Sequence, residues 1–92
     1  MIKSFRHSGI EKFFMTGSKA GIQPKHAAKL AIQLFALNRA KSAQDMNAPG
    51  WDLHPLHRDL QGHWSIKVNG NWHLTFTFVG EDPILVDYQD YH

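Results

Sequence analysis

Hydrophobic and polar residues alternate along the second half of the chain, which is the pattern of β-strands with one buried face. Residues 64–68 place Trp, Ile and Val at every second position, and residues 72–78 place Trp, Leu, Phe and Phe in the same way. A third apolar run follows the turn sequence at 80–83 and predicts a last strand at about 84–91. This half therefore predicts an antiparallel sheet.

The register of the first hairpin follows from its two apolar faces. Asn69-Gly70 indicates a tight turn, but a two-residue loop would pair apolar with polar residues. A three-residue loop at 69–71 avoids this by pairing Val68 with Trp72, Ile66 with Leu74 and Trp64 with Phe76. We then expect a shared polar face made of His63, Ser65, Lys67, His73, Thr75 and Thr77.

The first half has helical rather than alternating periodicity. Residues 2–5 favour a short edge strand, and Ser8 with Glu11 has the capping-box spacing of a helix that ends near Gly17. Pro24 begins a longer helix, whose predicted apolar stripe is Ala27, Leu30, Ala31, Leu34 and Leu37. The predicted fold is α+β: two N-terminal helices packed on a mostly antiparallel, twisted β-sheet, as one domain of residues 1–92.

Composition narrows the class of protein. There is no cysteine for a disulfide framework or a thiolate metal site, and no apolar run has the length of a membrane helix or a signal core. We therefore expect a cytoplasmic protein without membrane contact. Residues 1–50 carry eight basic residues against two acidic ones, whereas residues 51–92 carry two against six. The basic half suggests a polyanionic partner or simply solvated helix faces.

Five of the seven histidines follow residue 53, and His54 and His57 flank Pro55 in a predicted loop or strand end. Imidazoles transfer protons near neutral pH, and a nearby cation such as Arg58 suits an anionic substrate. One interpretation is RNA cleavage without a metal, in which a 2′-hydroxyl attacks the adjacent phosphate. The alternatives are structural histidines, or a zinc site formed by His54 and His57 with Asp90 and His92, which Pro55 disfavours.

Six short segments, in this order and spacing, resemble one family along essentially the whole chain. They are MIKSF at 1–5, LHPL at 53–56, GxWSI at 62–66, NW at 71–72, LTF at 74–76 and DYH at 90–92. The sequence resembles the HigB-type toxins of bacterial type II toxin–antitoxin systems, within the RelE superfamily. This resemblance implies a RelE-like fold.

The resemblance also implies an activity and partners. It implies a ribosome-dependent, metal-independent endoribonuclease that cleaves mRNA in the A site of the 70S ribosome and uses no cofactor. A HigA-type helix-turn-helix antitoxin would neutralise the toxin, and DNA would be contacted only through that antitoxin. The alternative that the residues leave open is a module that binds the ribosome or RNA and inhibits translation without cleaving.

Carried over by position, His54 and His92 match the acid–base histidines of the family. Asp90 and Tyr91 match the terminal residues that complete the site, whereas His57 stands where the family commonly has Lys. The basic residues that we expect to bind RNA or the ribosome are Arg58, Lys67, Lys25, Lys29 and Arg39. We expect no metal ligands.

The main departure from the family pattern is His73, at the position of a phosphate-binding Arg. Imidazole is shorter and cannot make a bidentate contact, so the substitution predicts weakened activity. The sequence leaves three explanations open: compensation by Arg58 or Lys67, a weaker enzyme, or a detoxifying substitution.

Overall fold

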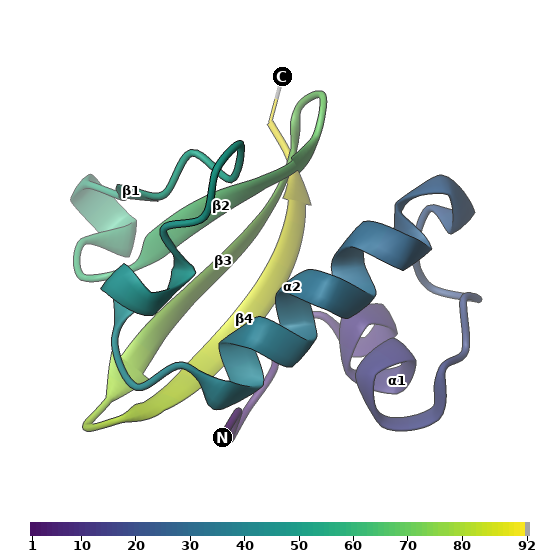
Figure 1. The fold of residues 1–92 in the computed structure, drawn as a ribbon, viewed down its shortest axis with the longest axis horizontal. Coiled ribbons are helices and arrows are strands. Elements are labelled where there is room, and N and C mark those ends of the chain that lie inside the picture. Colours follow the sequence, from purple (N-terminus) through teal and green to yellow (C-terminus); the bar gives the residue numbers. More distant parts are fainter. Residues whose placement is uncertain (92) are drawn as a thin grey trace.

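The computed structural model describes residues 1–91, in which two helices pack on one side of a four-stranded antiparallel sheet (Figure 1). The α-helices are α1 (Ser8–Thr16) and α2 (Ala27–Arg39), and the strands are β1 (His54–Pro55), β2 (Trp64–Asn69), β3 (Trp72–Val79) and β4 (Asp82–Asp90). Three 3₁₀ turns connect them: η1 (Pro24–His26), η2 (Ala43–Met46) and η3 (Arg58–Leu60). The strand order is β1-β2-β3-β4. The predicted α+β fold is confirmed.

The β2–β3 hairpin has the predicted register except beside its turn. Ile66 pairs with Leu74 and Trp64 with Phe76, as the apolar pattern requires. The expected pairing of Val68 with Trp72 is wrong, because the register shifts between Lys67 and Asn69 and Trp72 pairs with Asn69. A bulge thus supplies the extra residue that we assigned to the loop. Gly70 has φ +57°, a left-handed conformation that glycine adopts without steric cost, so the turn is of the kind that Asn-Gly favours.

Strand β4 begins two residues earlier than predicted and contains a second bulge. The register shifts between Thr75 and Thr77 of β3, and Leu85 of β4 has φ +55°, a rare conformation for a bulky residue. The N-terminal segment holds this bulge: the Leu85 N–H donates to Ser4 Oγ at 2.9 Å, and the Val86 N–H donates to the Ser4 carbonyl at 3.2 Å. The predicted edge strand at 2–5 is reduced to one parallel bridge between Phe5 and Val86.

Helix α2 supplies much of the core. Leu30, Leu34 and Leu37 are completely buried, as predicted from their spacing. Ala31 is exposed, which corrects the predicted stripe, and Gln33 is buried instead. The Gln33 amide donates to the Lys67 carbonyl at 2.8 Å, so a polar side chain fixes α2 to β2. Within residues 1–91, neither helix combines the length and the apolar character that a membrane span requires.

Helix α1 starts one residue earlier than the capping-box spacing suggested. His7, not Ser8, is the N-cap: its Nδ1 accepts a hydrogen bond from the Ile10 N–H at 3.1 Å, and Ser8 is already helical. The helix ends at Gly17, with φ +80°, as predicted. Its first turn lies directly against the loop before η1, because a Cβ on Gly9 would sit 2.4 Å from the carbonyl oxygen of Gly21.

Candidate functional site

The polar face of the sheet carries two cross-strand rows of residues near the end of β4. One row runs across all four strands as His54, Ser65, Thr75 and Asp87, and the next contains Lys67, His73 and Gln89. The end of β4 lies beside the β2–β3 turn (Figure 1). Ser65 and Thr75 are buried whereas Lys67 is exposed. The hydroxyls therefore form the floor of this face, and the longer side chains form its rim.

Two imidazoles meet on this face. The ring centroids of His54 and His73 are 6.3 Å apart, with the rings nearly perpendicular. His54 Nδ1 lies 2.8 Å from the Asp52 carbonyl oxygen, and His73 Nδ1 lies 2.9 Å from the Asn71 carbonyl oxygen. A carbonyl only accepts hydrogen bonds, so each Nδ1 is the donor and each Nε2 is left for other chemistry. Asp52 has φ +52°, an unusual conformation adjoining the site.

Tyr91 covers His73 from the end of β4. The two rings are stacked, with centroids 4.5 Å apart and planes 24° apart. The Tyr91 N–H donates to the Asn71 carbonyl at 2.8 Å, so one carbonyl oxygen holds both Tyr91 and His73. Burial raises the pKa of the Tyr91 phenol; the Ser65 hydroxyl opposes this and Asp87 adds to it. The Ser65 Oγ is near the phenol, but among the described residues it completes no well-formed hydrogen bond.

A buried polar cluster supports the end of β4 from the opposite face of the sheet. His26 Nδ1 lies 2.6 Å from the Tyr88 hydroxyl, and the Trp72 ring stacks on Tyr88 at 4.4 Å. Burial is the main cause that lowers the pKa of His26, with a smaller contribution from Lys25. Burial also raises the pKa of Tyr88, opposed by the Gln23 backbone and reinforced by Asp90. Both groups are therefore held neutral near pH 7.

Other predicted site residues lie apart from the two imidazoles. Asp90 pairs with Trp72 in the β3–β4 register, which places it on the face of Tyr88 rather than that of His73. His57 and Arg58 are exposed on the connection after β1, and no hydrogen bond or ring contact between described residues joins them to His54. His92, a predicted catalytic residue, lies outside the described residues.

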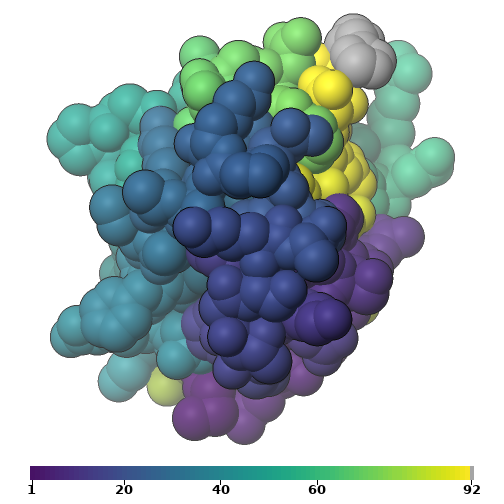
Figure 2. Space-filling view, turned by 90° about the vertical axis from the view of Figure 1, so that its right-hand side faces the viewer, coloured from purple at the N-terminus to yellow at the C-terminus, as the bar shows by residue number. Residues whose placement is uncertain are grey.

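The three helical basic residues are exposed on the surface formed by η1 and α2: Lys25, Lys29 and Arg39. The Arg39 guanidinium also lies 5.6 Å from the centre of the Phe35 ring. This helical surface faces the viewer in Figure 2, where the end of β4 reaches its upper edge.

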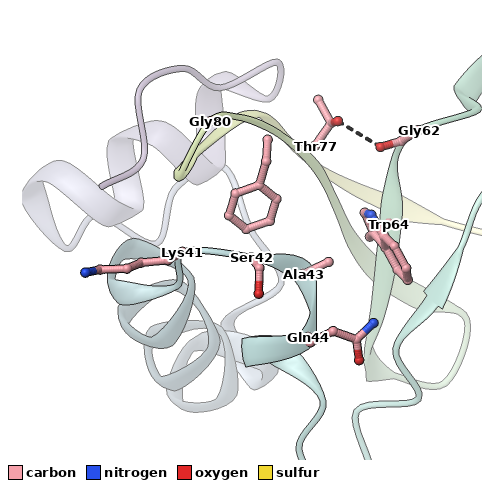
Figure 3. Close-up of a pocket in the computed structure, with 9 residues that line it drawn as sticks. Lys41, Ser42, Ala43, Gln44, Gly62, Trp64, Thr77 and Gly80 are labelled. Carbon is pink, nitrogen blue, oxygen red and sulfur yellow. Dashed lines mark hydrogen bonds between the residues drawn. The ribbon is translucent and has the colours of Figure 1, made fainter.

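A separate hollow of about 410 Å³ is lined by residues of η2, β2 and β3, including Gln44, Trp64 and Thr77, and by Lys41 before η2 (Figure 3). The Thr77 hydroxyl at its wall donates to the Gly62 carbonyl at 2.8 Å. None of the predicted site residues lines this hollow. Across residues 1–91 there is no group of three or more His, Asp or Glu side chains that could hold a metal ion.

Sequence reasoning missed the parts of the site that are main chain. The carbonyls of Asp52 and Asn71 orient the two imidazoles, yet a carbonyl gives no signal in residue type. The support from His26 and Tyr88 was also missed, because the two residues are 62 positions apart. The Asn69-Gly70-Asn71 sequence was an available signal, since it marks the turn to which the Asn71 carbonyl belongs.

Comparison with known proteins identifies the family of this chain. Residues 3–92 match the family model described as the RelE-like toxin of the type II toxin–antitoxin system HigB. The chain is 37% identical to Endoribonuclease HigB of Proteus vulgaris over 92 residues, which covers all of both chains. The α+β fold is therefore that of a RelE-like toxin. Within that class, the chain belongs to the HigB-like toxin family.

Proposed function

We propose that this toxin is a ribosome-dependent, metal-independent endoribonuclease that cleaves mRNA in the ribosomal A site, in the cytoplasm, as a single domain of residues 1–92. Two findings support the proposal. The chain belongs to a toxin family, and its full-length relative is named an endoribonuclease. The observation that carries the chemistry is the pair of imidazoles, His54 and His73, whose Nδ1 atoms are fixed by main-chain carbonyls.

In the proposed reaction a base removes the proton from a 2′-hydroxyl, and that oxygen attacks the adjacent phosphorus. The bond from phosphorus to the 5′-oxygen breaks, and an acid protonates the leaving oxygen. The products are a 2′,3′-cyclic phosphate and a free 5′-hydroxyl. His54 is well suited to proton transfer because its neutral Nε2 carries a lone pair. His92 is its proposed acid–base partner.

The other proposed site residues bind or orient the RNA. The Tyr91 ring, beside His73, is suited to stacking on a base of the A-site codon. Asp90 and His57 are proposed to complete the site, with Arg58 and Lys67 contacting phosphates and Lys25, Lys29 and Arg39 contacting the ribosome. We also propose that His73 makes this toxin weaker than one with Arg at the same position.

A toxin of this family implies an antitoxin partner. We propose that the partner is a HigA-type helix-turn-helix protein and that the toxin reaches DNA only through it. Co-expression with the neighbouring gene should restore growth, and the purified complex should bind its own promoter whereas the toxin alone should not.

Primer extension on reconstituted translating ribosomes tests the activity. We expect new 5′ ends inside A-site codons with the wild-type protein, and none with the protein and mRNA in the absence of ribosomes. His54→Gln and His92→Gln should each lower the cleavage rate by about 10²-fold or more while circular dichroism stays unchanged. Full cleavage by a folded His54→Gln variant would contradict the assigned role of His54.

One feature favours a second function, a module that docks without cleaving: position 73 carries His, where the family resemblance leads us to expect a phosphate-binding Arg. That function predicts intact mRNA together with ribosome binding that weakens as salt rises. The same primer-extension experiment, combined with sedimentation of the bound protein with ribosomes, separates the two.

A further inference from the structure

The hydrogen bond of His73 decides what its ring can offer a ligand. Its Nδ1 lies 2.9 Å from the Asn71 carbonyl oxygen, which can only accept, so the proton of the neutral ring sits on Nδ1. A neutral imidazole has a single N–H, so Nε2 then carries a lone pair. Neutral His73 therefore presents a hydrogen-bond acceptor to the polar face, and only the doubly protonated ring presents a donor there.

Phosphate oxygens at neutral pH are acceptors, so two lone pairs would meet if neutral His73 faced a phosphate through Nε2. Protonation removes this conflict, because it places an N–H on Nε2 and a positive charge on the ring. We propose that His73 binds the scissile phosphate only as the imidazolium, so protonation of this one ring switches the phosphate contact on. This inference rests on the proposed endoribonuclease function and deepens it.

The same main-chain arrangement has the opposite consequence at His54. Its Nδ1 donates to the Asp52 carbonyl at 2.8 Å, so its neutral Nε2 also carries a lone pair. A lone pair is what a general base needs, and His54 is therefore competent when neutral. Cleavage then requires a neutral His54 and a charged His73 at the same time.

Several charged or titratable groups face His73 from the elements packed against it. Two are aromatic neighbours: the ring centroid of His54 in β1 lies 6.3 Å from that of His73, and the ring centroid of Tyr91 lies 4.5 Å from it. Two share its face of the sheet: Lys67 of β2 is the register partner of His73, and Asp87 of β4 lies two residues before Gln89, the other register partner. Tyr91 presents the face of its ring, which attracts cations. Asp87 Oδ2 accepts from the Gln89 amide at 2.7 Å, beside the register partner of His73.

The test compares the wild-type protein with His73→Arg and His73→Gln in single-turnover cleavage on ribosomes between about pH 6 and about pH 8. Arginine keeps its charge throughout, so this variant controls for the ribosome and for every other titrating group. The rate of His73→Arg divided by that of wild type should rise steadily as pH increases, because a histidine can lose its charge and an arginine cannot. The His73→Gln profile should parallel that of His73→Arg at a lower rate.

A ratio that stays constant with pH would overturn the inference and leave the endoribonuclease function intact. Absence of cleavage by wild type and His73→Arg alike would instead overturn both. Long-range ¹H–¹⁵N spectra of the free protein give an independent readout, in which neutral His73 should show the Nδ1–H tautomer. An Nε2–H tautomer would also overturn the inference.

Discussion

The buried pair of His26 and Tyr88 shows how one residue can make the stability of the fold depend on pH. His26 is 2% exposed, and its Nδ1 is 2.6 Å from the Tyr88 hydroxyl. Its Nε2 is buried without a hydrogen-bond partner among the described residues, so the ring has little to gain from a second proton. Protonation would bury a charged ring whose Nε2–H has no acceptor among the described residues, so the packing of η1 on β4 favours neutral His26.

We expect acidification to destabilise the protein through His26. Its pKa is lowered in the folded state, so the unfolded chain takes up the proton first as pH falls below the ordinary histidine value of about 6.5. This contribution to stability is complete above that value and is lost progressively down to the lowered folded pKa. Urea unfolding at several pH values should show a smaller acid loss for His26→Gln than for wild type. Identical losses would contradict this role.

At the scale of elements, the close crossing of Gly9 and Gly21 holds α1 against the loop before η1. A helical Gly→Ala change normally stabilises by roughly 0.5–1 kcal/mol. Gly9→Ala should instead destabilise by about 1–3 kcal/mol, because its Cβ would lie 2.4 Å from a main-chain oxygen. Chemical unfolding of Gly9→Ala and of the wild-type protein measures this difference in the free energy of unfolding.

Ser8→Ala is the matched control for Gly9→Ala. Ser8 is exposed and helical, and His7 provides the cap, so this variant should change the free energy of unfolding by less than about 0.5 kcal/mol. A loss of about 1 kcal/mol would mean that Ser8 caps the helix after all.

Element types and most of the strand register were predictable, because alternation and helical spacing reflect burial directly. The bulges at Val68 and Leu85 were not, since each depends on contacts with another segment. Leu85 keeps its φ of +55° where Ser4, 81 residues away, accepts its N–H. In the site, the place of His73 on the polar face followed from the hairpin register. The place of His54 on the same face and of Asp90 on the other face required the pairing of β1 and of β4, which the sequence did not predict.

At the scale of the whole molecule, charge is divided between the two halves of the chain. The helical half carries about +6 and the sheet half about −4, although the total is only +2. The imidazole pair and Tyr91 belong to the acidic half, and the exposed helical cations belong to the basic one. An anionic ribosome should therefore be met first by the helices.

Reversing Lys25, Lys29 and Arg39 together to Glu should weaken ribosome binding by about tenfold or more at low salt, with a smaller loss at high salt. The matched control is reversal of Lys3, Lys12 and Lys19, which changes net charge equally and involves exposed residues. Sedimentation with ribosomes at two salt concentrations measures both. Equal weakening by the two triples would indicate a general charge effect rather than a binding surface.

The shared carbonyl of Asn71 makes the geometry of the site depend on the backbone of one turn. The oxygen that holds His73 and Tyr91 belongs to the main chain, so it is present whatever side chain occupies position 71. A change of side chain at 71 that keeps the turn therefore leaves this anchor in place, whereas a change in the shape of the turn would displace both rings together. Gly70 is the sensitive neighbour, because a residue with a Cβ adopts its φ of +57° only with strain. The two rings are thus coupled through a single main-chain oxygen.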